Sequence, residues 1–252
     1  MASKQKFGVG VLIAVTRTDS LGNVLAVPIP YRLGILHEVS TDFSFSVKTL
    51  YGNAQLPVDL GRSQAKLAFS AKMADINVAA LAALHFGIVP TVGIKLPLLD
   101  YPAPIPATPF QITPVIPGSG TFVADLGVQD TSGNNFTRVT SVPATSQYSV
   151  SGAGIYTFAA ADTGKAMLIS LEYSAATGGI VVPMTNQLMG YSPSFSVILY
   201  NDSKGSKLGL KLTNCQSEKL ALPFKNEDFT VADFGWMALD DGTGSAGYWC
   251  QA

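Results

Sequence analysis

The chain has 252 residues, enough for one large all-β domain or two smaller ones, and a formal net charge of only -1 with an isoelectric point near 6.1. Without a basic excess, sequence-specific DNA binding is not expected. Only 13% of the residues are charged and the mean hydropathy is +0.29, whereas roughly 25% are charged in an average soluble protein. Such a surface protects poorly against association, so we expect copies of the chain to cover one another. The alternative is an ordinary globule whose hydropathy is raised by glycine and alanine.

The first 40 residues are predicted to form strands and turns. Two lysines precede the apolar run 7–15, an order that resembles a signal peptide. The run contains two glycines and is not followed by a small-x-small cleavage pattern, so we interpret it as a first strand. No apolar run approaches the roughly 18 residues needed to cross a bilayer, and membrane insertion is not expected.

The chain is predicted to be organised around residues 42–87. Apolar and polar residues alternate in 42–48 and again in 66–71, which is typical of half-buried strands that can pair as antiparallel neighbours. The intervening residues 49–63 are predicted to form a long loop, because a hairpin needs only roughly two to five connecting residues.

A helix is predicted at 75–86, directly after these strands. Asp75 suits the N-cap position, the following residues are rich in alanine and leucine, and Gly87 suits the left-handed position after a helix. One face of this helix carries small and aliphatic residues that can pack on a sheet.

The remainder of the chain is predicted to be β-rich. Eight prolines in 90–117 indicate an extended connector, either docked on the surface or flexible. Short alternating runs in 118–175, separated by turn residues, indicate a sandwich or barrel. Residues 195–213 predict a hairpin, and 229–236 a closing strand.

These patterns together predict a mainly β fold: an antiparallel β-sandwich or barrel with one flanking helix at 75–86 and a long inter-strand loop. Residues 1–110 and 176–252 are expected to form the core. Residues 111–175 are expected to form an additional β-rich segment, either inserted or part of the same sandwich.

No enzyme motif is recognisable, so catalysis, a cofactor and a metal site are not expected. His37 and His85 are the only histidines, and Cys215 and Cys250 lack the spacing of a zinc site and are expected to be free buried thiols. A carbohydrate-binding module is an alternative suggested by scattered aromatic residues, whose dispersion favours core and interface roles instead. These residues are Tyr51, Tyr101, Tyr148, Trp236 and Trp249.

Several stretches resemble the major tail tube proteins of tailed bacteriophages. They are residues 47–59 (VKTLYGNAQLPVD), the strand 66–71, the alanine-rich helix ending in His-Phe-Gly at 85–87, and the C-terminal order of 186–190 (NQLMG), a hairpin and 224–229 (FKNEDF). The resemblance covers about two-thirds of the chain, in pattern more than in diagnostic motifs, and residues 90–173 do not match it.

This resemblance implies a sandwich or barrel of the tail tube type, in hexameric rings that stack into a hollow conduit for delivering the genome into the host. Implied partners are further copies and other tail proteins, namely the tape measure, tail terminator, and distal tail or baseplate proteins. DNA would pass through the lumen transiently, without sequence-specific binding. The expected location is the virion tail, assembled in the cytoplasm of the bacterial host.

The resemblance and the residue pattern together suggest two surfaces. The long loop is predicted to reach the next ring, and a small-polar strand face is predicted to line the lumen. An alternative is another virion component, a head decoration or collar protein. The predicted stacking residues are Leu50, Tyr51, Gly52, Asn53, Gln55, Leu56, Pro57, Asp59 and Arg62, and the predicted lumen residues are Asp42, Ser44, Ser46 and Lys48.

Overall fold

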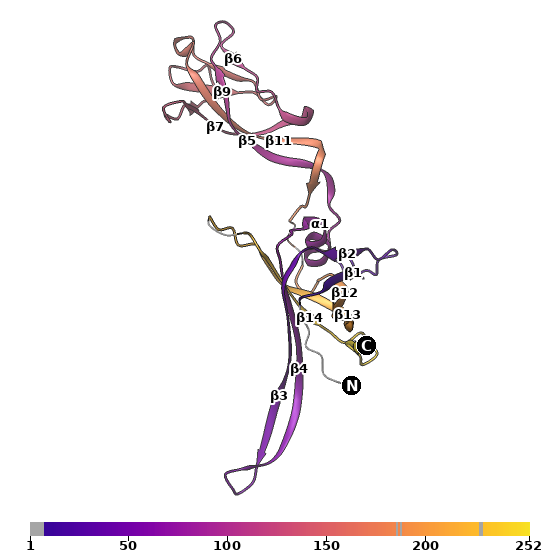
Figure 1. The fold of residues 1–252 in the computed structure, drawn as a ribbon. Coiled ribbons are helices and arrows are strands. Elements are labelled where there is room, and N and C mark those ends of the chain that lie inside the picture. Colours follow the sequence, from indigo (N-terminus) through magenta and orange to yellow (C-terminus); the bar gives the residue numbers. More distant parts are fainter. Residues whose placement is uncertain (1–7, 185, 187, 227–228) are drawn as a thin grey trace. The chain divides into compact units, whose positions relative to one another are not determined.

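The computed structural model describes residues 8–184, 186, 188–226 and 229–252. The contacts divide the chain into unit 1, Met1–Pro90 with Val182–Ala252, and unit 2, Thr91–Val181 (Figure 1). Unit 2 is thus longer at both ends than the segment 111–175 set apart in the sequence. The predicted mainly β class with one short helical segment is confirmed. Within the described residues none of the three sheets closes on itself, so the predicted barrel is not supported.

Unit 1 is built on an eight-stranded sheet in the order β2-β1-β12-β13-β14-β4-β3, with β15 also paired to β13. All of these neighbours are antiparallel, and the predicted hairpin of β12 and β13 is confirmed. The strands are β1 (Val11–Thr16), β2 (Pro30–Leu33), β3 (Leu36–Tyr51), β4 (Pro57–Met73), β12 (Ser194–Ser203), β13 (Ser206–Ala221), β14 (Ala232–Ala238) and β15 (Gly247–Gln251).

The core of unit 1 lies between one face of this sheet and the helical segment. Phe195, Phe234 and Trp236 are almost completely buried. Phe69 stacks on Trp236 with 6.0 Å between the ring centroids, and Leu84 of the helical segment belongs to the same cluster. Because burial of one large apolar side chain stabilises a fold by about 1.5–3 kcal/mol, this cluster accounts for much of the stability of unit 1.

The helical segment begins later than predicted. Helix α1 spans Val78–Leu81 and continues as a π-helical turn, Ala82–Phe86. Asn77 rather than Asp75 is the N-cap, with its Oδ1 atom accepting a hydrogen bond from the backbone N–H of Ala80 at 3.1 Å. The Asp75 side chain instead lies against Gly34, where a Cβ atom would come within 2.6 Å of it.

Gly87 ends the helical segment as predicted. Its φ of 64° is left-handed, and a Cβ atom at this position would lie 2.6 Å from the backbone nitrogen of Ser20. Both the conformation and the lack of space therefore require glycine.

Residues 49–63 do not form the predicted loop. Strands β3 and β4 stay paired as far as Tyr51 opposite Pro57, so only residues 52–56 form the connection. The prediction that 42–48 and 66–71 lie on antiparallel neighbouring strands is confirmed, but only 42–44 lie directly opposite 66–68. The loop prediction was wrong because bulges after Phe45 and after Leu50 interrupt the two-residue alternation on which strand recognition depends. We call residues 42–68, the distal part of this hairpin, the arm.

Unit 2 has a three-stranded sheet, β5-β11-β7, and a four-stranded sheet, β6-β10-β9-β8. Side chains from both sheets share one core, which includes Tyr156 and Ile169. Two 3-10 turns, Pro117–Ser119 and Ala160–Asp162, lie in its connections. The strands are β5 (Thr91–Pro104), β6 (Gln111–Ile112), β7 (Thr121–Asp130), β8 (Thr137–Arg138), β9 (Gln147–Val150), β10 (Tyr156–Phe158) and β11 (Ala166–Val181).

Three of the prolines in 90–117 lie in a strand rather than in the predicted connector. Strand β5 contains Pro97, Pro102 and Pro104 and pairs with β11 along most of its length. Because β5 is at the edge of its sheet, it needs N–H donors on one side only, and prolines are tolerated there.

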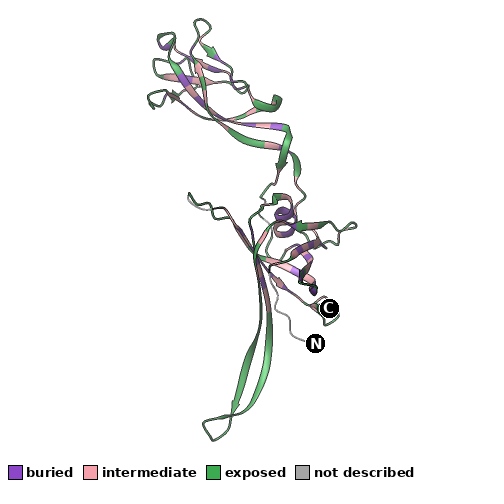
Figure 2. Ribbon diagram, viewed as in Figure 1, coloured by how far each residue is buried: buried purple, intermediate pink, exposed green. Residues whose placement is uncertain are grey.

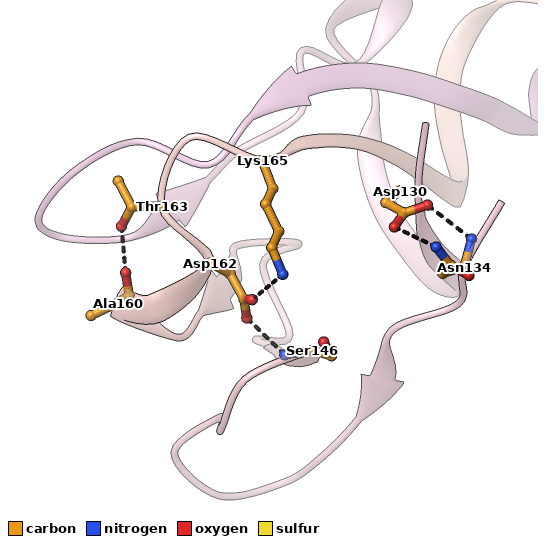
Figure 3. A network of polar contacts seen from close by, with 7 residues as sticks. All are labelled: Asp130, Asn134, Ser146, Ala160, Asp162, Thr163 and Lys165. Atoms are coloured by element: carbon orange, nitrogen blue, oxygen red, sulfur yellow. Dashed lines mark hydrogen bonds and ion pairs between the residues drawn. The ribbon is translucent and has the colours of Figure 1, made fainter. Parts of the chain in front are cut away.

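Two carboxylates, Asp162 and Asp130, hold loops of unit 2 in place. Asp162 is fully buried and accepts hydrogen bonds from Lys165 Nζ at 2.7 Å and from the backbone N–H of Ser146 at 2.8 Å (Figure 3). Nearby, Asp130 closes a turn by accepting two bonds from Asn134, at 2.9 Å each. These contacts fix loops that have few apolar residues of their own.

A third carboxylate, Asp125, is hydrogen-bonded to two tyrosines. Its side chain is 3% exposed and accepts hydrogen bonds from the hydroxyl groups of Tyr148 at 2.7 Å and Tyr156 at 3.0 Å. Burial, reinforced by this carboxylate, raises the pKa of both tyrosines. Both hydroxyl groups are therefore held as neutral donors.

Candidate functional site

The arm is the most exposed regular structure in unit 1 (Figure 2). Every residue of β3 from Thr41 to Tyr51 and of β4 from Pro57 to Lys66 is exposed. A two-stranded ribbon without further packing is at best marginally stable in water. The arm is therefore a candidate surface for contact with another protein.

One face of the arm is apolar and continues the core of unit 1 outward. The ring of Phe43 lies 5.5 Å, edge-on, from that of buried Phe69, and 5.7 Å from that of Trp249. The guanidinium of Arg62 lies 4.9 Å from the ring centroid of Phe45. Phe43, Phe45 and Val47 share the core-facing side as predicted, yet they are 42%, 47% and 50% exposed. In the single chain these three side chains contact too few other residues to be buried.

The opposite face is polar and carries the predicted lumen residues. Asp42, Ser44, Ser46 and Lys48 are exposed along it, with Ser44 opposite Lys66. Toward the base of the arm the same face has two ion pairs, Lys72 with Glu38 and Lys219 with Asp233, each at 2.6 Å. In these two pairs each lysine is neutralised by a carboxylate.

The structure places the predicted stacking residues together at the distal half of the arm, on paired strands and a short turn. Leu50, Tyr51 and Leu56 are 64%, 59% and 79% exposed. Gly52, Asn53 and Gln55 form the turn with Leu56, whereas Pro57, Asp59 and Arg62 lie on β4. Val58 and Leu60 are 71% and 55% exposed. They were missed because the second bulge interrupts the alternation of apolar and polar residues there.

A second apolar surface lies beside the helical segment. It is a groove of about 270 Å³ lined in part by α1, which lies at the end of unit 1 away from the arm tip (Figure 1). Sequence reasoning missed it because its residues come from three separated parts of the chain. They are Ile76, Val78, Leu81, Ala82, Phe86, Val182, Met184, Leu220 and Leu222.

His85 lies on the π-helical turn, with its Nδ1 atom 2.5 Å from Ser217 Oγ. Burial lowers the pKa of His85, so the imidazole takes up a proton more readily in the unfolded chain than in the folded one.

Because of this lowered pKa, we expect stability to be greatest above about pH 6.5 and to fall as the pH drops through 6.5 toward the folded pKa of His85. Thermal unfolding of unit 1 between pH 7.5 and pH 5 tests this, and His85→Gln should flatten the dependence. An unchanged slope would contradict this role of His85.

The remaining candidate residues are dispersed. Trp236 and Tyr148 are buried in the cores of units 1 and 2, whereas Tyr51 and Trp249 are exposed. Cys215 is buried, and burial raises its pKa to about 12; Cys250 is exposed, which corrects the prediction of two buried thiols. In the described part of the chain, no three His, Cys, Asp or Glu side chains are grouped so that they could hold a metal.

No helix among the described residues is both long and apolar enough to span a membrane. A scan against protein-family models finds no match to this chain, and a search of curated proteins finds no significant similarity.

Proposed function

We propose that the chain is a structural subunit that assembles with its own copies into a hollow tube, of the kind made by bacteriophage tail tube proteins. The arm is the observation that carries the proposal. Its apolar face begins at the core of unit 1, where Phe43 contacts Phe69, and continues outward to residues that the chain itself does not cover. Exposed apolar surface of this kind marks a protein contact.

Self-association explains the arm better than binding of a small ligand. A contact between the arm of one copy and a different surface of the next does not close on itself, and such heterologous contacts build rings or filaments. The low charge of the chain fits a subunit whose surface is largely covered by neighbours. In the proposed tube, as the resemblance implies, hexameric rings stack through the arm.

The polar face of the sheet and arm is proposed to line the tube. DNA binds proteins chiefly through phosphate contacts with lysine and arginine. Lys72 and Lys219 are paired with carboxylates on this face, and Lys48 and Lys66 of the arm stay exposed on it; with its paired lysines and small polar residues, the face would hold a passing duplex weakly. This suits a conduit that must release the genome.

Electron microscopy and native mass spectrometry of the purified protein at increasing concentration test the proposal. The expected result is ring-sized oligomers followed by tubes of constant diameter. Isolated rings, or copies bound to phage heads, would favour a collar or decoration protein instead. A monomer at all concentrations would refute assembly altogether.

A further inference from the structure

We infer that the groove beside α1 is the receptor for the arm tip of a second copy. The inference rests on the proposed self-assembly and identifies its second surface. The arm supplies an exposed apolar tip, and the groove supplies an exposed apolar depression in the same unit.

The chemistry of the groove selects an aliphatic protein side chain. Its lining residues are all apolar and none is charged. At about 270 Å³ it is slightly smaller than most small-molecule sites, which begin near ~300 Å³ and contain placed polar groups. A partner that brought a charge into it would lose hydration without compensation.

The arm tip has the matching composition. Leu56 and Val58 are 79% and 71% exposed, and Asp59 is the only charged residue in 50–60. The two surfaces can therefore meet without burying an unpaired charge if Asp59 lies at the rim of the contact. Stable interfaces have the same arrangement, with few charged residues in the core and polar residues at the rim.

The placement of the two surfaces excludes an intramolecular contact. Within unit 1 the arm leads away from the helical segment, and its tip lies at the opposite end from α1 (Figure 1), which lines the groove. The tip of one copy can thus reach only the groove of another. Repetition of that contact adds copies in one direction, as a stack of rings requires.

The contact is large enough only if the shaft of the arm is covered as well as its tip. A two-stranded ribbon running from Phe43 to Tyr51 is roughly 30 Å long and ~10 Å wide. Covering only its apolar face, since the polar face lines the tube, buries on the order of 300 Å² on each partner, about 600 Å² in total. The tip and the surfaces beside the shaft must therefore supply the rest of the roughly 1,200 Å² at which stable interfaces begin. The groove then anchors the tip while neighbouring surfaces cover the shaft.

Disulfide trapping tests the inference. In a Cys250→Ser background, Leu56→Cys is combined with Val78→Cys, which lies in the groove and is 49% exposed. Assembled material is oxidised and analysed on denaturing gels. The expected result is a ladder of covalent dimers, trimers and larger species. The matched control combines Leu56→Cys with Val142→Cys, 91% exposed in unit 2, and should give no ladder.

The outcomes separate this inference from the proposed function. Tubes without a ladder would overturn the groove as receptor and leave tube formation intact. Absence of tubes from the unmodified protein would overturn both. A ladder of equal intensity from the control pair would show non-specific collision and would also overturn the assignment.

Discussion

Removal of residues 47–63, with Ser46 and Gln64 joined through an Asn-Gly turn, is expected to abolish tube formation and leave the subunit folded. Phe45 stays opposite Ala65, and a two-residue turn of this type matches the twist of paired strands. The removed residues are exposed, so their loss takes little from the core. Electron microscopy measures assembly, and tryptophan fluorescence during urea unfolding measures stability.

A pair of point substitutions provides the control for this deletion. Val58→Asp places a charge at the arm tip and Val142→Asp places one in unit 2, both at strongly exposed positions. We expect Val58→Asp to raise the concentration needed for assembly by at least about tenfold, since burial of one unpaired charge costs more than about 1.4 kcal/mol. Val142→Asp should assemble normally. Normal tubes from the deletion variant would refute the role of the arm.

Replacement of Asp125 by alanine is expected to destabilise unit 2 by about 2–6 kcal/mol without affecting unit 1. The change leaves the hydroxyl groups of Tyr148 and Tyr156 buried without their shared acceptor, and each such group costs about 1–3 kcal/mol. Calorimetry should show a transition shifted to lower temperature.

Tryptophan fluorescence separates the two units in this experiment. Both tryptophans, Trp236 and Trp249, belong to unit 1, so the fluorescence transition should not move. Tyr148→Phe removes one donor and keeps the carboxylate, and it should cost only about 1 kcal/mol. An equal shift of the fluorescence and calorimetric transitions would show that the two units unfold as one.

Local patterns were sufficient to predict part of the fold. Alternation identified the two strands that pair around Phe43 and Leu67, and the position of Gly87 after an alanine-rich run identified the end of the helix. Both depend on neighbours in sequence. The start of the helix was missed by two residues: Asn77 is the N-cap, and Asp75 lies against Gly34, a residue distant in sequence.

The remaining features depend on sheet topology and on contacts between distant parts of the chain, which a local sequence pattern does not contain. A strand with three prolines is acceptable only at a sheet edge, and that position follows from topology. The length of the arm was hidden by bulges, and the groove unites residues from Ile76 to Leu222. For the candidate site, the pattern located the arm tip and the polar face but not the surface proposed to receive the tip.

The two points at which the chain crosses into and out of unit 2 are neighbours. Thr91 lies opposite Val181 at the ends of β5 and β11, so their backbones are only about 5 Å apart. A short turn, or an unrelated domain whose termini are adjacent, can therefore be grafted in place of unit 2 without stretching the surrounding chain. In a self-assembling lattice, such a graft would be displayed once per copy, at regular intervals.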